Sequence, residues 1–210
     1  MIKIIKQILF AMCLLPLLRL VVLAMTDGLG ANPVEFIIRS LGTWTLVMLM
    51  ATLAVTPVNI LTGVNRVVQF RRMLGLFTFF YACLHFFSYA GLDLWFEWAA
   101  ISKDITKHPY VLIGFSAFLM LIPLAMTSNK RMIMKLGRRW KTLHRSVYLI
   151  AILGVVHYWW LVKKDITEPA IYGAVLLLLF TIRLLNSPHR KAGTLAVSGV
   201  RPTNLIELPP

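Results

Sequence analysis

Three histidines lie within strongly apolar stretches of this chain. His85 lies in LFTFFYACLHFFSYAG, and His144 and His157 lie in KTLHRSVYLIAILGVVHYWW. An imidazole inside a lipid bilayer is costly unless it binds a proton, an ion, a metal or a cofactor. The first question is therefore which proton, ion, metal or cofactor these three side chains bind.

The surrounding sequence is that of an integral membrane protein. The 210 residues are 59% hydrophobic and only 14% charged, and the mean hydropathy is +0.76, which is too apolar for a soluble domain. A helix needs about 20 apolar residues to cross a bilayer. The sequence predicts an all-α fold, a six-transmembrane-helix bundle with spans at residues 7–25, 41–60, 74–90, 110–127, 143–161 and 170–185.

The charged residues are divided between the two ends of this bundle. The net charge is +14. One set of loops contains Lys3, Lys6, Arg66, Arg71, Arg72, Lys130, Arg131, Lys135, Arg138, Arg139, Lys141, Arg183, Arg190, Lys191 and Arg201. The opposite loops contain Asp27, Glu35, Asp93, Glu97, Asp104, Asp165 and Glu168. The positive-inside rule makes the basic loops and both termini cytoplasmic. Orientation in the membrane accounts for the positive net charge, so we expect no nucleic-acid partner. The acidic outer face suits a protein partner with a basic patch.

The chain is expected to form one domain. The longest loops have about twenty residues, too few for a separate extramembrane domain, so residues 1–186 form the transmembrane domain and residues 187–210 a cytoplasmic tail without helical periodicity.

His85 and His157 are predicted to lie at the same depth. At about 1.5 Å per residue from Arg72 and Lys141, they lie roughly 20 and 24 Å from the cytoplasmic boundary. The third and fifth helices both run outward, so these imidazoles can supply the two axial ligands of a b-type haem. The alternative is that each histidine is a packed residue bonded to a neighbouring helix.

The other polar candidates are expected to lie apart from this pair. His144 is roughly 15 Å shallower than His85 and belongs to a separate site. His108 and His189 are interfacial and expected to be ordinary. Arg19 lies in the outer half of the first helix, where it either binds haem propionates or snorkels to the interface.

Several longer segments resemble one family. The chain is similar to the haem-binding membrane subunits of bacterial periplasmic methionine-sulfoxide reductases (the MsrQ family, formerly YedZ), in the ferric-reductase-like transmembrane superfamily. The resemblance covers about residues 16–185 and is carried by GLGANPVEFIIRSLGTWTL, TLAVTPV, RRMLGL, LHFFSY, KHPYVLIGF, LAMTS and KLGRRWKTLHRSVYL.

The resemblance implies an electron-transfer subunit of the bacterial inner membrane rather than an enzyme. Such proteins pass electrons from the quinone pool, or from a cytosolic flavin reductase, through haem to a periplasmic molybdopterin subunit that reduces methionine sulfoxide. The family's histidines correspond to His85, His144 and His157. Many relatives hold two haems, but the position 14 residues before His85 is Arg71. His144 could therefore bind a second haem, orient a flavin, or take part in proton or quinone chemistry. Binding of FMN is implied by the resemblance alone.

Two other functions remain as alternatives. A transporter would use the histidines for protons or metal ions, but no internal repeat marks a midplane substrate site. A self-contained ferric or oxygen reductase would need a cytosolic FAD and NADPH domain, for which this chain has no segment.

Overall fold

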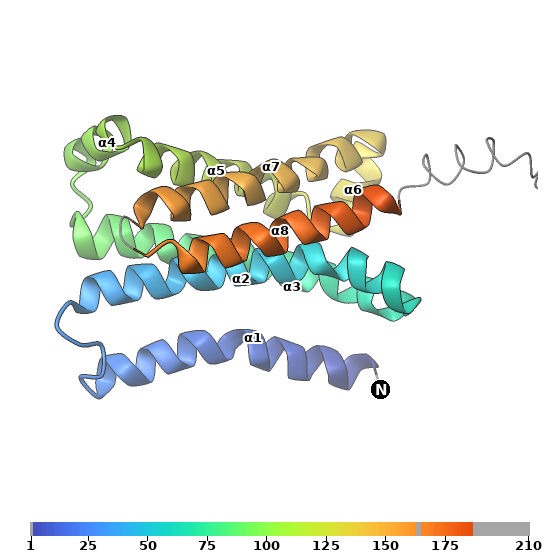
Figure 1. The fold of residues 1–210 in the computed structure, drawn as a ribbon, viewed down its shortest axis with the longest axis horizontal. Coiled ribbons are helices and arrows are strands. Elements are labelled where there is room, and N and C mark those ends of the chain that lie inside the picture. Colours follow the sequence, from blue (N-terminus) through green and yellow to red (C-terminus); the bar gives the residue numbers. More distant parts are fainter. Residues whose placement is uncertain (1, 163–164, 187–210) are drawn as a thin grey trace, which may run out of the picture.

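The computed structural model describes residues 2–162 and 165–186, and this part of the chain is almost entirely helical (Figure 1). The predicted tail, residues 187–210, lies outside it. The elements are α1 (Ile2–Met25), α2 (Pro33–Thr62), a 3-10 helix η1 (Asn65–Phe70), α3 (Arg71–Ser88), a π-helix η2 (Tyr89–Asp93), α4 (Trp98–Lys107), α5 (Pro109–Met126), α6 (Lys130–Leu136), α7 (Arg138–Leu161) and α8 (Thr167–Leu185).

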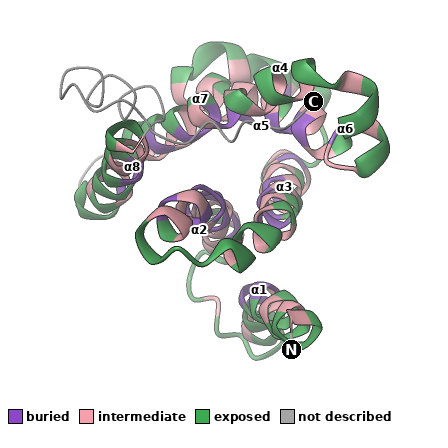
Figure 2. Ribbon diagram, turned by 90° about the vertical axis from the view of Figure 1, so that its right-hand side faces the viewer, coloured by how far each residue is buried: buried purple, intermediate pink, exposed green. Residues whose placement is uncertain are grey.

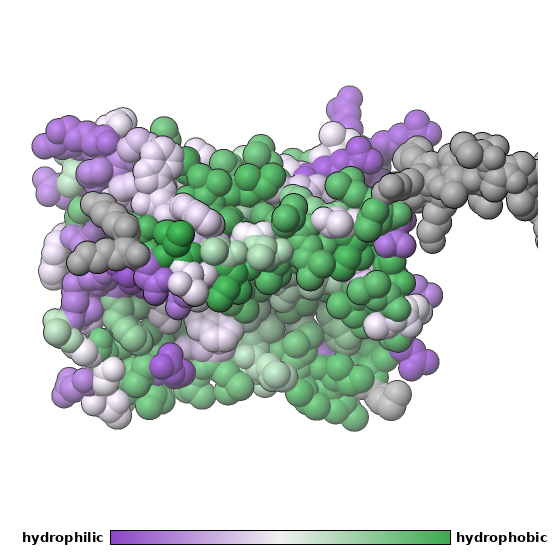
Figure 3. Space-filling model, in the orientation of Figure 1, coloured by the Kyte–Doolittle hydropathy of each residue, from purple (hydrophilic) through white to green (hydrophobic). Residues whose placement is uncertain are grey.

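Five segments among the described residues are long and apolar enough to cross a membrane: α1, α2, the continuous stretch Asn65–Asp93, α5 and α8. The remaining predicted span, residues 143–161, lies within α7, a helix of 24 residues that is not one of these five. Its length suits a span, but its first turns carry Arg138, Arg139, Lys141 and Arg145, so composition alone does not identify it. The surface has an apolar band between two hydrophilic ends (Figure 3).

The long helices lie side by side, with α2 and α3 at the centre of the bundle (Figure 2). The most extensive helix pairs are α2 with α3 and α5 with α7, and α8 packs on α2 and α7. On the opposite side of the central pair, α1 packs on α2 and α3. The bundle thus consists of two antiparallel hairpins, α2–α3 and α5–α7, with α1 and α8 at its margins.

The ends of α2 are set by its sequence. The Asn32 side chain caps the first turn by accepting a hydrogen bond from the Glu35 amide at 3.3 Å, and Pro33 occupies the first helical position, where no amide hydrogen is needed. Gly63, with φ of +70°, ends the helix. As a result α2 has 30 residues and extends a full turn or more beyond the predicted apolar run.

Two buried clusters hold the helices together. One joins α2, α5, α7 and α8 around Leu53, Ile150 and Ala151. The other joins α1, α2 and α3 around Tyr81, whose side chain is fully buried and whose hydroxyl donates to the Cys13 carbonyl at 2.7 Å. This hydrogen bond ties α1 to α3 in the region where apolar burial between lipid-facing helices contributes little.

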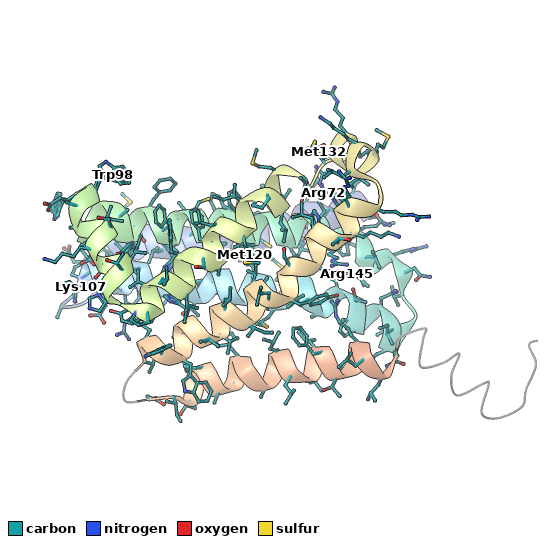
Figure 4. All side chains as sticks on the ribbon, turned by 90° about the horizontal axis from the view of Figure 1, so that it is seen from above. Arg72, Trp98, Lys107, Met120, Met132 and Arg145 are labelled. Atoms are coloured by element: carbon teal, nitrogen blue, oxygen red, sulfur yellow. The ribbon has the colours of Figure 1, made fainter. Side chains whose placement is uncertain are left out.

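Two short helices that hydropathy did not predict, α4 and α6, lie at opposite ends of the bundle (Figure 1). At the α4 end, Asp104 accepts hydrogen bonds from the Tyr89 hydroxyl at 2.5 Å and from His108 Nδ1 at 2.7 Å. Trp98 and Lys107 lie at this end, whereas Arg72 and Arg145 lie at the other (Figure 4). Arg72, Trp98 and Lys107 thus lie at the ends of the bundle that the loop assignment predicts.

Candidate cofactor site

His85 and His157 meet in the interior of the bundle. His85 lies on α3 and His157 on α7, and their ring centroids are 6.3 Å apart with an angle of 72° between the ring planes. Both side chains are half-buried. The prediction that these two histidines lie at the same depth and face each other is confirmed.

Each imidazole is fixed by a backbone carbonyl of its partner helix. His85 Nδ1 is 2.9 Å from the Ile38 carbonyl oxygen on α2, and His157 Nδ1 is 2.7 Å from the Tyr110 carbonyl oxygen on α5. A carbonyl oxygen only accepts, so both Nδ1 atoms must carry the proton. Both Nε2 atoms are then left with a free lone pair, as a metal-ligating histidine requires.

The separation of the rings suits one metal ion bound from opposite sides. Metal–nitrogen bonds of about 2 Å, with each ring nitrogen about 1.2 Å from its ring centre, place two such centroids roughly 6 to 6.5 Å apart. The observed 6.3 Å lies in this range. Haem iron needs only two protein ligands, since the macrocycle supplies the others. Within the described residues, no group of three or more His, Cys, Asp or Glu side chains could hold a bare ion.

Aromatic side chains line the space between the two hairpins next to this pair. Phe86, which follows His85 on α3, stacks on Phe118 of α5 at 4.9 Å with an angle of 15°. Phe115 lies 5.7 Å from the same Phe86 ring. At the end of α7, an apolar groove of about 500 Å³ is lined by Val155, Val156, Trp159, Trp160 and Val162. The segments of α3, α5 and α7 near the two histidines are thus rich in apolar and aromatic side chains.

Two glycines face the imidazoles. A methyl group added at Gly42 of α2 would lie 3.0 Å from His85 Cε1 and 3.1 Å from its Nδ1. One added at Gly114 of α5 would lie 2.7 Å from His157 Nδ1 and 2.8 Å from its Cε1. Each glycine follows by one helical turn the residue whose carbonyl anchors the ring.

The two halves of the site have the same residue spacing. Each histidine is 47 residues after its carbonyl partner and 43 residues after its glycine, so a constant shift of 72 residues relates the α2–α3 hairpin to the α5–α7 hairpin. The expectation that no internal repeat marks a midplane substrate site stays a prediction, since this shared spacing concerns the histidine pair. The sequence contains this common spacing of glycine and histidine, but it is hard to detect because the rest of the two hairpins differs in sequence.

His144 has contacts of its own, distinct from those of the histidine pair. On α7, its Nδ1 is 3.2 Å from the Trp140 carbonyl and its ring stacks on the Trp140 indole at 4.0 Å. Its Nε2 lies 3.5 Å from the Ser128 hydroxyl. The 72-residue shift places Arg72, not a histidine, at the corresponding position of α3.

The remaining candidates lie away from the pair. His108 binds Asp104 at the end of α4, as an ordinary interfacial residue does, and His189 lies outside the described residues. Arg19 is exposed on α1, and its contact with a propionate stays a prediction.

Comparison with known proteins gives a consistent answer. The family model described as ferric reductase like transmembrane component matches residues 41–155, which cover most of α2, all of α3 and α5, and α7 as far as Val155. The chain is 46% identical to a protein-methionine-sulfoxide reductase heme-binding subunit MsrQ of Herminiimonas arsenicoxydans, over 93% of this chain and 91% of the relative.

Two further relatives carry the same name. The protein of Ralstonia nicotianae is 52% identical over 82% of this chain and 81% of its own length, and that of Rhodospirillum rubrum is 48% identical over 87% and 88%. No solved structure matches the chain. The extent of these alignments shows that the chain belongs to the MsrQ family of heme-binding subunits, within the ferric reductase like transmembrane proteins.

Proposed function

We propose that this chain is a b-type cytochrome that relays electrons across the membrane to a periplasmic methionine-sulfoxide reductase. The observation that carries the proposal is the geometry of His85 and His157, two facing imidazoles whose free nitrogens point away from their carbonyl anchors. Bound haem would supply one-electron chemistry at its iron. The relatives' printed name, heme-binding subunit, supports the same cofactor.

The protein's contribution is to hold and orient the ligands. The Ile38 and Tyr110 carbonyls fix the tautomer of each ring and make Nε2 more basic. Both anchors are backbone atoms within long helices, α2 and α5, so the ligand positions are set by helix packing rather than by a flexible loop. Phe86, Phe115 and Phe118 pack against one another between α3 and α5 and would add apolar surface beside the His85 helix.

The proposal places the chain in the bacterial inner membrane with six spans and both termini in the cytoplasm. The support is that α7 packs along α5 for its length and that Arg72 and Arg145 lie at the end of the bundle where α1 begins and α8 ends (Figures 1 and 4). His85 and His157 lie near the other ends of α3 and α7. The site is therefore nearer the periplasmic face.

Electrons would enter from the quinone pool, or from a cytosolic flavin reductase, and leave to a molybdopterin-containing catalytic subunit. The chain itself is then an electron-transfer subunit, and sulfoxide reduction takes place on the partner. One haem is assigned to His85 and His157. His144, enclosed by Trp140 and Ser128 nearer the basic end, is left for a second cofactor, a haem with a non-histidine partner or FMN.

The relay is tested by stopped-flow spectroscopy of membranes that contain this chain. Reduced quinone should reduce the haem, and added methionine sulfoxide should reoxidise it only when the molybdenum partner is present. The matched control is the His157→Ala protein, in which the quinone should no longer produce the signal. Equally fast reoxidation by sulfoxide without the partner would contradict the relay and indicate a self-contained reductase.

A further inference from the structure

The repeated contact of a glycine with each histidine ring is unlike the contacts of the other glycines within the long α-helices. Gly75 on α3 and Gly154 on α7 have room for a methyl group, with nearest atoms at 3.7 and 3.6 Å. At Gly42 and Gly114 the nearest atoms belong to the imidazoles of His85 and His157 and lie at 3.0 and 2.7 Å. In both hairpins the ring thus lies against the bare backbone of the partner helix.

We propose that Gly42 and Gly114 are positioning residues that set where the two imidazoles bind iron. This inference rests on the proposed role of His85 and His157 as haem ligands. Each ring contacts its partner helix at two points, a carbonyl that binds Nδ1 and, one turn further along, a glycine that faces the ring. The carbonyl fixes which nitrogen is protonated, and the glycine fixes how closely the ring approaches the helix.

The role follows from the short reach of histidine. A collision between a methyl group and a long side chain is relieved by rotation of distant torsions, but an imidazole has only two torsions and is held at Nδ1 by a hydrogen bond. A methyl group at Gly42 or Gly114 must either push the ring away from its carbonyl or turn it out of line with the iron. Both displacements weaken the axial bond.

The two glycines are not expected to be equally sensitive. At Gly114 the added carbon lies 2.7 Å from Nδ1 and 3.1 Å from Cγ, next to the atom that anchors the ring. At Gly42 the contacts are 3.0 and 3.1 Å, and Nε2 lies at 3.6 Å. We therefore expect Gly114→Ala to disturb the site more than Gly42→Ala.

The experiment compares purified full-length protein carrying Gly42→Ala or Gly114→Ala with two matched controls, Gly75→Ala and Gly154→Ala, on the helices that carry the ligands. Loss of an outer-sphere contact to a metal ligand typically lowers metal affinity 10- to 100-fold. We expect Gly114→Ala to lower low-spin haem retention roughly 10-fold or more and Gly42→Ala by less. The haem that remains should gain high-spin character and bind carbon monoxide, while both controls keep the native spectrum.

A double-mutant cycle separates positioning from plain helix packing, since small residues also allow helices to approach one another. Without the ring there is nothing for the added methyl group to meet. Gly42→Ala should therefore lower the thermal unfolding temperature of the apo protein when His85 is present but not in a His85→Ala background, and Gly114→Ala should behave likewise with His157→Ala. If Gly114→Ala fails to accumulate in membranes, the double variant with His157→Ala should accumulate.

Two results would overturn the inference. One is haem content and spin state in Gly42→Ala and Gly114→Ala equal to those of the Gly75→Ala and Gly154→Ala controls. The other is the same loss of stability whether or not the histidine is present. Both differ from failure of the proposed function, in which His85→Ala and His157→Ala themselves keep the low-spin haem.

Discussion

At the scale of single residues, Arg183 is a basic side chain that makes hydrogen bonds inside the bundle. The sequence places it with the cytoplasmic basic residues, but it faces inward from α8. Its Nη1 donates to the Tyr148 hydroxyl at 2.5 Å, and its Nη2 donates to the Leu53 carbonyl of α2. That carbonyl would bind the amide of residue 57 in a regular helix, but Pro57 has none. Arg183 thus supplies the hydrogen-bond donor that Pro57 lacks.

This assignment predicts coupling between Arg183 and Pro57. Arg183→Leu should lower the free energy of unfolding in detergent by about 1 kcal/mol, because an interior carbonyl loses its donor. Pro57→Ala restores the backbone amide, so Arg183→Leu should cost less in that background. Thermal unfolding of the four proteins of the cycle measures the difference, with Tyr148→Phe as the control that removes only the hydroxyl contact. An equal cost of Arg183→Leu in both backgrounds would mean that Arg183 acts through Tyr148 alone.

The pairing of His85 with His157 could be predicted from the sequence, but the groups that fix the two rings could not. Depth along apolar helices is a local property, so counting from Arg72 and Lys141 was enough to pair His85 with His157 and to exclude His144. The carbonyl anchors are backbone atoms, which every residue has. The contact of Gly42 with His85 could not be predicted either, because small residues are common in membrane helices and only the packing of α2 on α3 shows which of them faces the ring.

At the scale of elements, the site is built from two copies of one hairpin. In each copy, one helix supplies a carbonyl and a glycine and the next supplies the histidine, with the same spacing in both. Helix packing between the α2–α3 and α5–α7 hairpins then brings the two histidines together. Length and hydropathy predicted the long helices correctly, because a span needs about 20 apolar residues. They did not predict α4 and α6, which are short and lie at the ends of the bundle.

Helix α7 provides a direct test of topology. If α7 crosses the membrane, Lys130 before it and Asp165 after it lie on opposite sides. In a Cys13→Ala/Cys83→Ala background, a membrane-impermeant maleimide should label Asp165→Cys in intact spheroplasts and Lys130→Cys only after permeabilisation. Labelling of both from the same side would show that α7 does not span.

At the scale of the whole molecule, the charge asymmetry is preserved but the outer acidic residues are less available than the sequence suggested. Glu35 pairs with Arg39 at 2.6 Å, Asp104 binds Tyr89 and His108, and Glu168 accepts from Tyr158. A partner at the periplasmic face would therefore meet an acidic surface smaller than the count of carboxylates indicates. His85 and His157 lie near the C-terminal ends of α3 and α7, the ends that the proposed orientation makes periplasmic, and this supports the proposed direction of electron flow.

The central claim is that His85 and His157 are the axial ligands of one haem, and the reduced-minus-oxidised visible spectrum of purified variants tests it most directly. His85→Ala and His157→Ala should each abolish the low-spin spectrum, because one lost ligand leaves the iron five-coordinate. His144→Ala, on the same helix as His157 but in a separate site, should keep it. An unchanged spectrum in His85→Ala together with loss of all haem in His144→Ala would contradict the pairing.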